Sequence, residues 1–172
     1  MANPVFDAVR TMVAVREYAD RPVPEAVVGE IIETAHLNAS SMNGQPWHFV
    51  VVRDRERLRQ LAGLAKTGPY VAGAALAVVV AAENDSPYAL SDASRAIQSM
   101  MLTAWADGVG SNWVGFTGMS AVGKLLGIPD DYDVIAVVPF GYPSHPATEG
   151  RKKRKPLGEI ASDEMFGTPF SG

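Results

Sequence analysis

The sequence predicts a single α+β domain with a layered architecture. Its 172 residues fall within the usual range for one compact domain. A content of 47% apolar and 20% charged residues is typical of globular proteins and excludes disordered or fibrous chains. Segments with helical periodicity and short apolar runs are mixed without regular strand–helix alternation. Neither an internal repeat nor an interdomain linker is visible, so residues 1–172 are expected to form one domain.

Helices are expected where capping residues precede apolar residues at helical spacing. Asn3-Pro4 combines an N-cap residue with a proline at the first helical position, and Asp54 can cap a short helix. The other helices are expected to begin after Pro24, at Ser91 or Asp92, and at Ser120. The longest helix runs from residue 91 or 92 to about Asp107 and stops at Gly108. Its apolar residues cover more than one face, which predicts burial between two layers or two subunits.

Strands are expected where apolar residues run between turn signals. The run that ends at Ala82 is fully apolar, which is typical of a strand buried on both faces. The expected strands cover residues 47–52, 74–82, 110–116 and 133–140. Residues 38–45 are too rich in short polar side chains and glycine for a regular element, so they are expected to form a loop.

Several classes of protein are excluded by what the chain lacks. The longest apolar run, Val71–Ala82, is shorter than the roughly 20 residues that cross a bilayer, and we expect a buried strand there. The N-terminus shows no signal-peptide pattern. The chain has no cysteine, which excludes disulfides, thiolate nucleophiles, iron–sulfur clusters and zinc–thiolate sites. We therefore expect a cytoplasmic protein with no membrane association.

Positive charge is concentrated in one segment near the end of the chain. The formal net charge is −4, yet five of the fifteen basic residues are consecutive, at positions 151–155. An acidic body with one cationic segment argues against a general nucleic-acid binder, in which basic residues spread over a face. Two interpretations remain open, a solvated charged tail and a segment that holds a small anion.

Conventional catalytic groups are poorly represented. His36, His48 and His145 are expected on a helix, a strand and a loop without metal-ligand spacing, so we expect no metal site. The sequence has no nucleophile elbow, no P-loop and no GxGxxG after a strand. If the chain is an enzyme, a cofactor is expected to perform the difficult step, and no side chain is assigned as catalytic.

The polar loop over residues 40–47 is the most informative segment. It offers two hydroxyls, two carboxamides and a glycine. Such groups suit a planar ligand with donors and acceptors around its rim. By composition alone, however, a plain turn with polar caps is the favoured interpretation.

This loop resembles the Ser-Ser/Thr-x-Asn-x-Gln-Pro-Trp signature of the nitroreductase family, whose members are FMN-dependent enzymes. Other segments resemble family motifs in the same order, at residues 15–18, 104–115, 140–143 and 152–157. The resemblance extends over residues 3–167. It implies a three-layer α+β fold with a mostly antiparallel central sheet flanked by helices. It also implies an intertwined homodimer in which the tail, residues 151–172, contacts the partner subunit.

The resemblance further implies an FMN site. Lys152 and Arg154 match the family's phosphate-binding cations near the C-terminus. Arg16 matches a basic position near the N1–O2 edge of the flavin, where a positive charge makes two-electron reduction easier. The other positions that match flavin-contacting residues are Ser40, Ser41, Asn43, Gln45, Val114 and Gly115. For Gln45, a structural role that bridges loop and strand stays open.

By the same resemblance, the expected function is electron transfer from NAD(P)H to a small organic acceptor, such as a nitroaromatic compound or a quinone, in a ping-pong scheme. Three alternatives stay open. The chain is a flavin-binding sensor or carrier without turnover, an enzyme that transforms the flavin itself, or a protein that contacts nucleic acid through residues 151–155.

Two features depart from the family pattern. The family's Arg-x-Ser aligns with Met-Val-Ala at residues 12–14, so a phosphate-contacting arginine and a serine hydroxyl are missing. Losing one charge-assisted contact costs about 1.5–3 kcal/mol, which predicts weakened FMN retention. Arg10, one turn earlier, is a candidate replacement. The connection between Ala82 and Ser91 is short, which predicts an open site with broad or unusual substrate tolerance.

Overall fold

The structure, a computed structural model, describes residues 3–115, 117–146 and 152–171. Within them the helices are α1 (Pro4–Thr11), α2 (Glu25–His36), α3 (Arg55–Leu64), α4 (Ala89–Ala106) and α5 (Met119–Leu126). The strands are β1 (Trp47–Val52), β2 (Leu76–Glu83), β3 (Gly110–Ser111) and β4 (Tyr132–Gly141). Short 3₁₀ turns are η1 (Ser41–Asn43), η2 (Pro69–Gly73) and η3 (Leu157–Glu159).

The strands form one antiparallel sheet in the order β1-β2-β4-β3. β2 is a central strand that pairs with β1 on one side and β4 on the other, with a register shift after Val80. All of its residues except Glu83 are buried, because helices cover both faces of the strand. The prediction of a fully buried strand in this region is confirmed.

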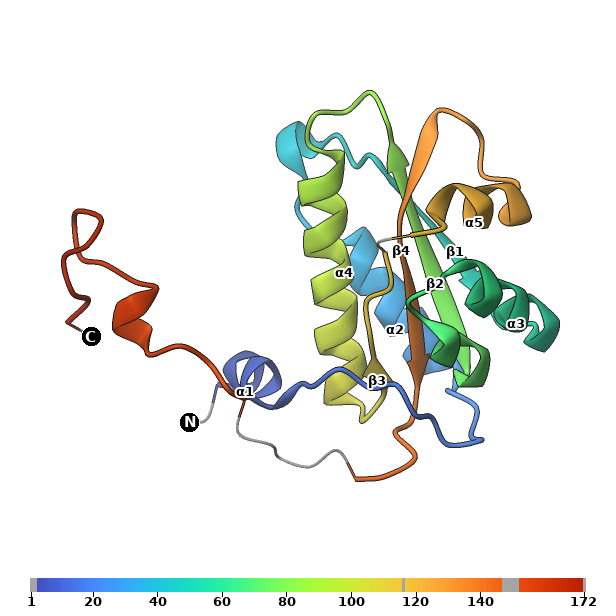
Figure 1. The fold of residues 1–172 in the computed structure, drawn as a ribbon, viewed down its shortest axis with the longest axis horizontal. Coiled ribbons are helices and arrows are strands. Elements are labelled where there is room, and N and C mark those ends of the chain that lie inside the picture. Colours follow the sequence, from blue (N-terminus) through green and yellow to red (C-terminus); the bar gives the residue numbers. More distant parts are fainter. Residues whose placement is uncertain (1–2, 116, 147–151, 172) are drawn as a thin grey trace.

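Helices lie on both faces of the sheet and give three layers (Figure 1). α2 and α4 pack on one face, in a core that includes Val78 and Phe140. α3 and α5 pack on the other face, where Val79 and Val137 point, because strand side chains alternate between the two faces. The predicted α+β fold, with a central antiparallel sheet flanked by helices, is confirmed. None of the helices described is both long and apolar enough to cross a membrane.

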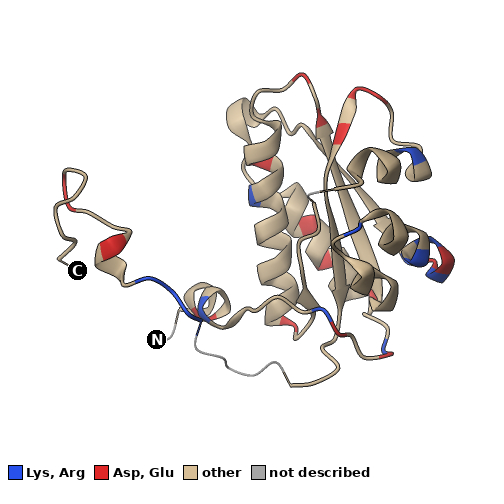
Figure 2. Ribbon diagram, in the orientation of Figure 1, with Lys and Arg blue, Asp and Glu red and all other residues tan. Residues whose placement is uncertain are grey.

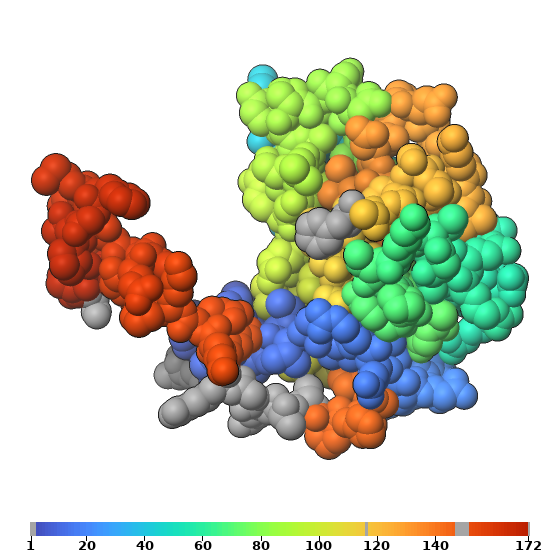
Figure 3. Space-filling view, viewed as in Figure 1, coloured from blue at the N-terminus to red at the C-terminus, as the bar shows by residue number. Residues whose placement is uncertain are grey.

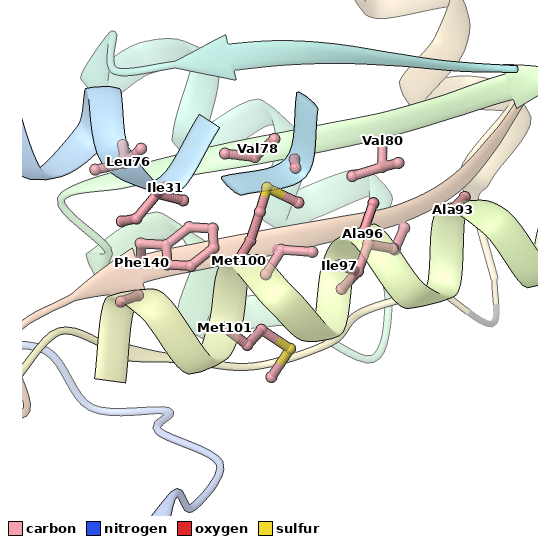
Figure 4. Packing of buried hydrophobic residues seen from close by; sticks show 14 of the residues in the cluster. Ile31, Leu76, Val78, Val80, Ala93, Ala96, Ile97, Met100, Met101 and Phe140 are labelled. Atoms are coloured by element: carbon pink, nitrogen blue, oxygen red, sulfur yellow. The ribbon is translucent and has the colours of Figure 1, made fainter. Parts of the chain in front are cut away.

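The longest helix, α4, is buried along most of its length. Figure 4 shows Ile97 and Met100 pointing toward the strands, whereas Met101 points away from them. Met101 is nevertheless only 9% exposed and belongs to the same core, so the buried face of α4 is broad, and burial of this helix between two subunits stays a prediction. Near its C-terminal end, Trp105 Nε1 donates to Thr11 Oγ1 at 2.9 Å and so joins α4 to the end of α1.

The predicted caps are confirmed. The Asn3 side chain accepts backbone hydrogen bonds at the start of α1, and the Asp54 side chain does the same at the start of α3. Gly108 and Gly127 follow the ends of α4 and α5 with φ values of 73° and 67°. Glycine is favoured at such positions because residues with a Cβ rarely adopt a left-handed backbone.

Two predicted strands are shorter in the structure. The apolar run that starts at Val71 forms a strand only from Leu76, where β2 begins, because residues 69–73 form the turn η2. That turn starts at a proline, which has no N–H to donate to a ladder. The strand expected over 110–116 is limited to β3 and an isolated bridge from Val114 to β4. Phe116 lies outside the described residues.

Directly after β4 the chain still pairs with the segment after α1, through backbone contacts between residues 142–144 and 17–19. The described part of the tail, residues 152–171, extends away from the sheet (Figures 1 and 3). Within that part, hydrogen bonds stay inside the tail apart from one, in which Lys152 Nζ donates to the Val9 carbonyl. That the tail forms one domain with the rest of the chain and contacts a partner subunit stays a prediction.

Candidate functional site

The polar loop between α2 and β1 has a strained backbone. Met42, Asn43 and Gln45 have φ values of 54°, 55° and 51°, a region that residues other than glycine rarely adopt. Such residues cluster at ligand-binding and active sites. Two hydrogen bonds that involve side chains help hold the loop on itself: the Gln45 N–H donates to Ser40 Oγ at 3.0 Å, and Gln45 Nε2 donates to the Asn43 carbonyl at 3.2 Å.

The four loop residues predicted to contact flavin differ in whether their polar groups are accessible to a ligand. Asn43 and Gln45 are exposed, whereas Ser40 and Ser41 are partly buried. Both polar groups of Ser41 are used within the fold, since its N–H donates to Asp92 Oδ2 at 2.9 Å and its hydroxyl to Asp92 Oδ1 at 3.2 Å. Ser41 therefore anchors the loop, while the carboxamides of Asn43 and Gln45 are accessible at the surface.

A second group of predicted residues lies where the segment after α1 passes β3. The Val15 N–H donates to the Ser111 carbonyl at 2.9 Å. This pairing places Arg16 over the ring of Tyr70, with its Cζ 5.9 Å from the ring centroid, within reach of a cation–π interaction. The Tyr70 hydroxyl accepts a hydrogen bond from Asn112 Nδ2 at 2.6 Å. Arg16 also borders an open groove of about 380 Å³.

Tyr70 and Asn112 were not predicted as part of the site. Tyr70 follows a Gly-Pro turn and has no pattern around it that marks a binding residue. Asn112 lies inside a segment that resembles a family motif, and its burial to 7% exposure is a property of the fold. Their link to Arg16 depends on contacts between distant segments, so residue type and spacing could not reveal it.

Val114 and Gly115 follow this group along the chain. Val114 is buried, and its N–H and carbonyl both pair with Val137 of β4, at 3.0 and 2.7 Å. The Gly115 N–H, in contrast, has no hydrogen-bond partner among the described residues. A Cβ on Gly115 would lie 2.5 Å from Trp113 Nε1 and 2.8 Å from the Ile135 carbonyl oxygen. The close approach of these groups explains why glycine is required there.

The basic segment of the tail passes α1 (Figure 2). Lys152 Nζ donates to the Val9 carbonyl at 2.5 Å, a helix-terminal carbonyl without an intrahelical partner. Burial, and then the neighbouring Arg154 guanidinium, lower the pKa of Lys152, because both disfavour a positive charge. Arg154 is exposed and donates to the Lys153 carbonyl at 2.9 Å. An anion bound between Lys152 and Arg154 would relieve their mutual repulsion.

Arg10, the candidate replacement for the missing arginine, lies beside this basic segment. It follows Val9, whose carbonyl holds Lys152. Its guanidinium is 3.3 Å from the Asp7 carboxylate, and its side chain is 61% exposed. An exposed pair of this kind is weak, so Arg10 is not tied to Asp7 by a strong interaction.

The polar loop and the basic segment lie at opposite ends of α4 (Figure 1). The loop is bonded to Asp92 near the N-terminal end of the helix. α1, which holds Lys152, is bonded to Trp105 near the C-terminal end. The helical rise between Asp92 and Trp105 is about 20 Å. One chain therefore does not bring the predicted loop contacts and the predicted phosphate cations together.

The arrangement defines a class of protein: a three-layer α+β domain whose candidate binding groups lie at the two ends of its long helix. In the part of the chain that the structure describes, no three His, Asp or Glu side chains form a group that could hold a metal ion. The model of the nitroreductase family matches residues 9–79 and 65–142. The chain belongs to the nitroreductase family.

Individual relatives agree with this assignment. A protein of Archaeoglobus fulgidus, provisionally named NADH dehydrogenase/NAD(P)H nitroreductase, is 37% identical over 139 residues, which cover 76% of this chain and 80% of that protein. The structure of an FMN-dependent nitroreductase from Clostridium difficile R20291 is similar, with a TM-score of 0.78 at 26% identity over 81% of this chain and 88% of the other. A structure from Bacteroides thetaiotaomicron VPI-5482, also provisionally named NADH dehydrogenase/NAD(P)H nitroreductase, has a TM-score of 0.88 at 26% identity over 96% and 100%.

Proposed function

We propose that this protein is an FMN-dependent oxidoreductase that passes electrons from NAD(P)H to a small organic acceptor, such as a nitroaromatic compound or a quinone. The observation that carries the proposal is the pair Lys152 and Arg154, which lies against α1 and forms no ion pair with a carboxylate among the described residues. The names of the relatives from C. difficile and A. fulgidus support FMN as cofactor and NAD(P)H as donor.

The residues present fit the parts of FMN. An ammonium group has three donors, and Lys152 uses one of them on Val9, so two are left for a phosphate. The exposed Arg154 guanidinium can add a charge-assisted pair of donors. The exposed carboxamides of Asn43 and Gln45 match the polar rim of a flat heterocycle. The left-handed backbone of both residues supports a segment shaped for a ligand rather than a plain turn.

Each group has a defined task in this proposal. Lys152 and Arg154 hold the phosphate, with Arg10 as a further cation beside them. Arg16 would supply positive charge near the N1–O2 edge of the ring, where it would favour reduction of the flavin. The Gly115 N–H, which has no partner among the described residues, would be available to the N5–O4 side of the ring. When bound, FMN supplies the hydride and electron transfer that side chains cannot perform.

The protein's own contribution is positioning and electrostatics. Donor and acceptor occupy the same site in turn, so no side-chain acid or base is required. The site is completed by a second copy, since the loop and the cations of one chain lie about 20 Å apart along α4. We therefore propose a homodimer in which the loop of one subunit meets the basic tail of the other.

Flavin binding and reduction test the proposal directly. FMN is titrated into the purified protein while flavin fluorescence is followed, and NADH or NADPH is then added without oxygen. We expect bound flavin, loss of its yellow colour with reduced nicotinamide, and recovery of the colour with a nitroaromatic compound or a quinone. If the yellow colour persists with reduced nicotinamide, the protein binds flavin without reducing it and acts as a flavin carrier. A protein that binds no FMN would contradict the proposal.

A pair of adjacent variants tests the phosphate site. Arg154→Gln removes a proposed phosphate contact, and we expect FMN affinity to fall roughly ten- to a hundred-fold. Lys155→Gln removes the same charge one residue away and is expected to leave the affinity unchanged. Equal losses in both variants would indicate a general effect of net charge and would contradict a specific phosphate site.

A further inference from the structure

Asp92 is a charged residue that the fold buries completely. Its exposed fraction is 0%, and no other Asp, Glu, Lys or Arg is buried among the residues that the structure describes. It lies in the first turn of α4, where the helix dipole favours a negative charge. Burying a carboxylate destabilises the fold unless hydrogen-bond donors surround it. The donors that contact Asp92 therefore indicate its role.

Several donors converge on this carboxylate. The loop contributes the N–H of Ser41 to Oδ2 at 2.9 Å and its hydroxyl to Oδ1 at 3.2 Å. From α4 itself, the Arg95 guanidinium donates to Oδ1, whereas the Ser91 hydroxyl, 3.4 Å from Oδ1, has a shorter bond to the Tyr88 carbonyl at 3.1 Å. Burial alone raises the pKa of Asp92, but the bonds from Ser41 and Arg95 outweigh burial and hold the pKa below its usual value. Asp92 is therefore an anion at neutral pH.

The carboxylate binds the residue at which the strained part of the loop begins. Met42 and Asn43 follow Ser41 directly in the left-handed region, and Gln45 lies two residues further on. Asparagine tolerates the left-handed region, but Met42 and Gln45 do not favour it, so the surroundings must impose their backbone geometry. On the other side of the loop, the buried Pro46 leads into β1.

Other polar contacts along α4 do not reach the strained residues. Ser99 Oγ donates to Asn38 Oδ1 at 2.9 Å, and the Thr34 and Thr103 hydroxyls are 3.0 Å apart. These bonds join α4 to the end of α2 and to Asn38 at the start of the loop, three residues before Ser41. Among the described residues, the side-chain contact between α4 and the residue directly before the left-handed segment is the one between Asp92 and Ser41.

We infer that Asp92 is a positioning residue for the cofactor: through Ser41 it fixes the loop so that Asn43 and Gln45 are held in flavin-binding geometry before flavin arrives. The inference rests on the proposed function, because it assigns FMN to this loop. A loop that is ordered in advance raises affinity, since binding no longer has to order it.

Asp92→Asn tests the inference, because it keeps the shape of the side chain and removes its charge. We measure the FMN dissociation constant and, in flavin-free protein, the hydrogen exchange of the amides of residues 41–45. We expect FMN affinity to fall roughly ten-fold or more and the amides to exchange faster. Ser99→Ala is the matched control, because it removes a bond between α4 and Asn38 and leaves Ser41 in place. We expect it to bind FMN as the wild type does.

A second variant separates positioning from general stability. Ser41→Ala removes only the hydroxyl bond, so we expect a smaller loss of FMN affinity. In the double variant with Asp92→Asn we expect no further loss, because both changes act through one contact. If Asp92→Asn does not fold, Ser41→Ala and Arg95→Gln replace it in the same measurements, because each removes a hydrogen bond to the Asp92 carboxylate.

The outcomes distinguish this inference from the proposed function. Wild-type affinity in Asp92→Asn, or additive losses in the double variant, would overturn the positioning role alone. A wild-type protein that binds no FMN would overturn the proposed function and with it the cofactor role of Asp92. In that case, the exchange rates would still show whether Asp92 holds the loop, because they are measured without flavin.

Discussion

Asp92 links charge, burial and loop geometry in one residue. Its carboxylate has no contact with solvent and is stabilised by the Ser41 N–H and hydroxyl and by the Arg95 guanidinium. Because these donors are lost on unfolding, the folded and unfolded states differ in their affinity for a proton at this position. The same bonds that shape the loop therefore make the stability of the fold depend on pH.

We predict that the contribution of Asp92 to the free energy of unfolding disappears in acid. The pKa of Asp92 is lower in the folded state than its ordinary value. Its contribution is therefore complete above the unfolded pKa of about 3.9 and is lost as the pH falls through the folded value. The wild type should exceed Asp92→Asn by roughly 1–3 kcal/mol at neutral pH, with a gap that narrows below about pH 4. Urea unfolding at several pH values measures this gap, and a gap that widens in acid would contradict the prediction.

Neighbouring residues of the predicted site show what sequence can and cannot reveal. Ser41 and Asn43 belong to one motif, yet Ser41 faces the buried Asp92 and Asn43 is exposed. Val114 and Gly115 are adjacent, yet Val114 has both backbone groups paired with β4. A motif records residue type and spacing, so it points to both segments. It could not say which member is used by the fold, because that depends on partners far away in the chain.

Among the elements, α5 depends most visibly on its two flanking glycines. Gly118 and Gly127 have φ values of 83° and 67°. Their surroundings differ, because a Cβ on Gly118 would overlap the carbonyl of Leu64 at the end of α3, whereas a Cβ on Gly127 would meet nothing within 4 Å. Gly118 thus allows α3 and α5 to pack closely, and Gly127 only ends a helix.

This difference predicts unequal effects of the same substitution. Gly127→Ala should lower the free energy of unfolding by about 1–2 kcal/mol, the cost of a left-handed residue with a Cβ. Gly118→Ala should lower it by more, because backbone atoms must also move apart. Thermal and urea unfolding of the two variants measures both values. Similar losses in the two variants would show that α3 and α5 do not approach each other as described.

Most elements could be predicted because their signals are local. The caps at Asn3 and Asp54 and the glycine stops of α4 and α5 each act within one helical turn, and the structure contains all of them. The turn at residues 69–73 was missed because its apolar residues run on into the strand, although Pro69 and Gly73 indicate a break. The interruption after β3 depends on Asn112, whose side chain contacts Tyr70 and the Trp113 N–H.

At the scale of the whole molecule, the described surface carries apolar groups that one chain leaves uncovered. α1 has no buried residue, and the tail extends away from the sheet with its apolar side chains in solvent (Figure 3). The exposed residues of these two segments include Val5, Phe6, Val9, Leu157, Ile160, Met165, Phe166 and Phe170. Burial of apolar surface contributes about 25 cal/mol per Å², so a second copy that covers these groups would be stabilised by them.

In the proposed dimer, each flavin site combines the polar loop of one chain with the basic tail of the other. Two defective proteins test it: one carries Ser40→Ala and Asn43→Ala in the loop, and the other carries Lys152→Gln and Arg154→Gln in the tail. Each alone should retain little FMN. When the two are co-expressed in equal amounts, half of the dimers are mixed and each mixed dimer has one intact site.

Bound FMN per chain in the co-expressed sample is the decisive measurement. A site shared between chains predicts recovery to about one FMN per four chains. A site formed within a single chain predicts no recovery, because every chain then carries a defect in its own site. Absence of recovery in samples that contain mixed dimers would contradict the account.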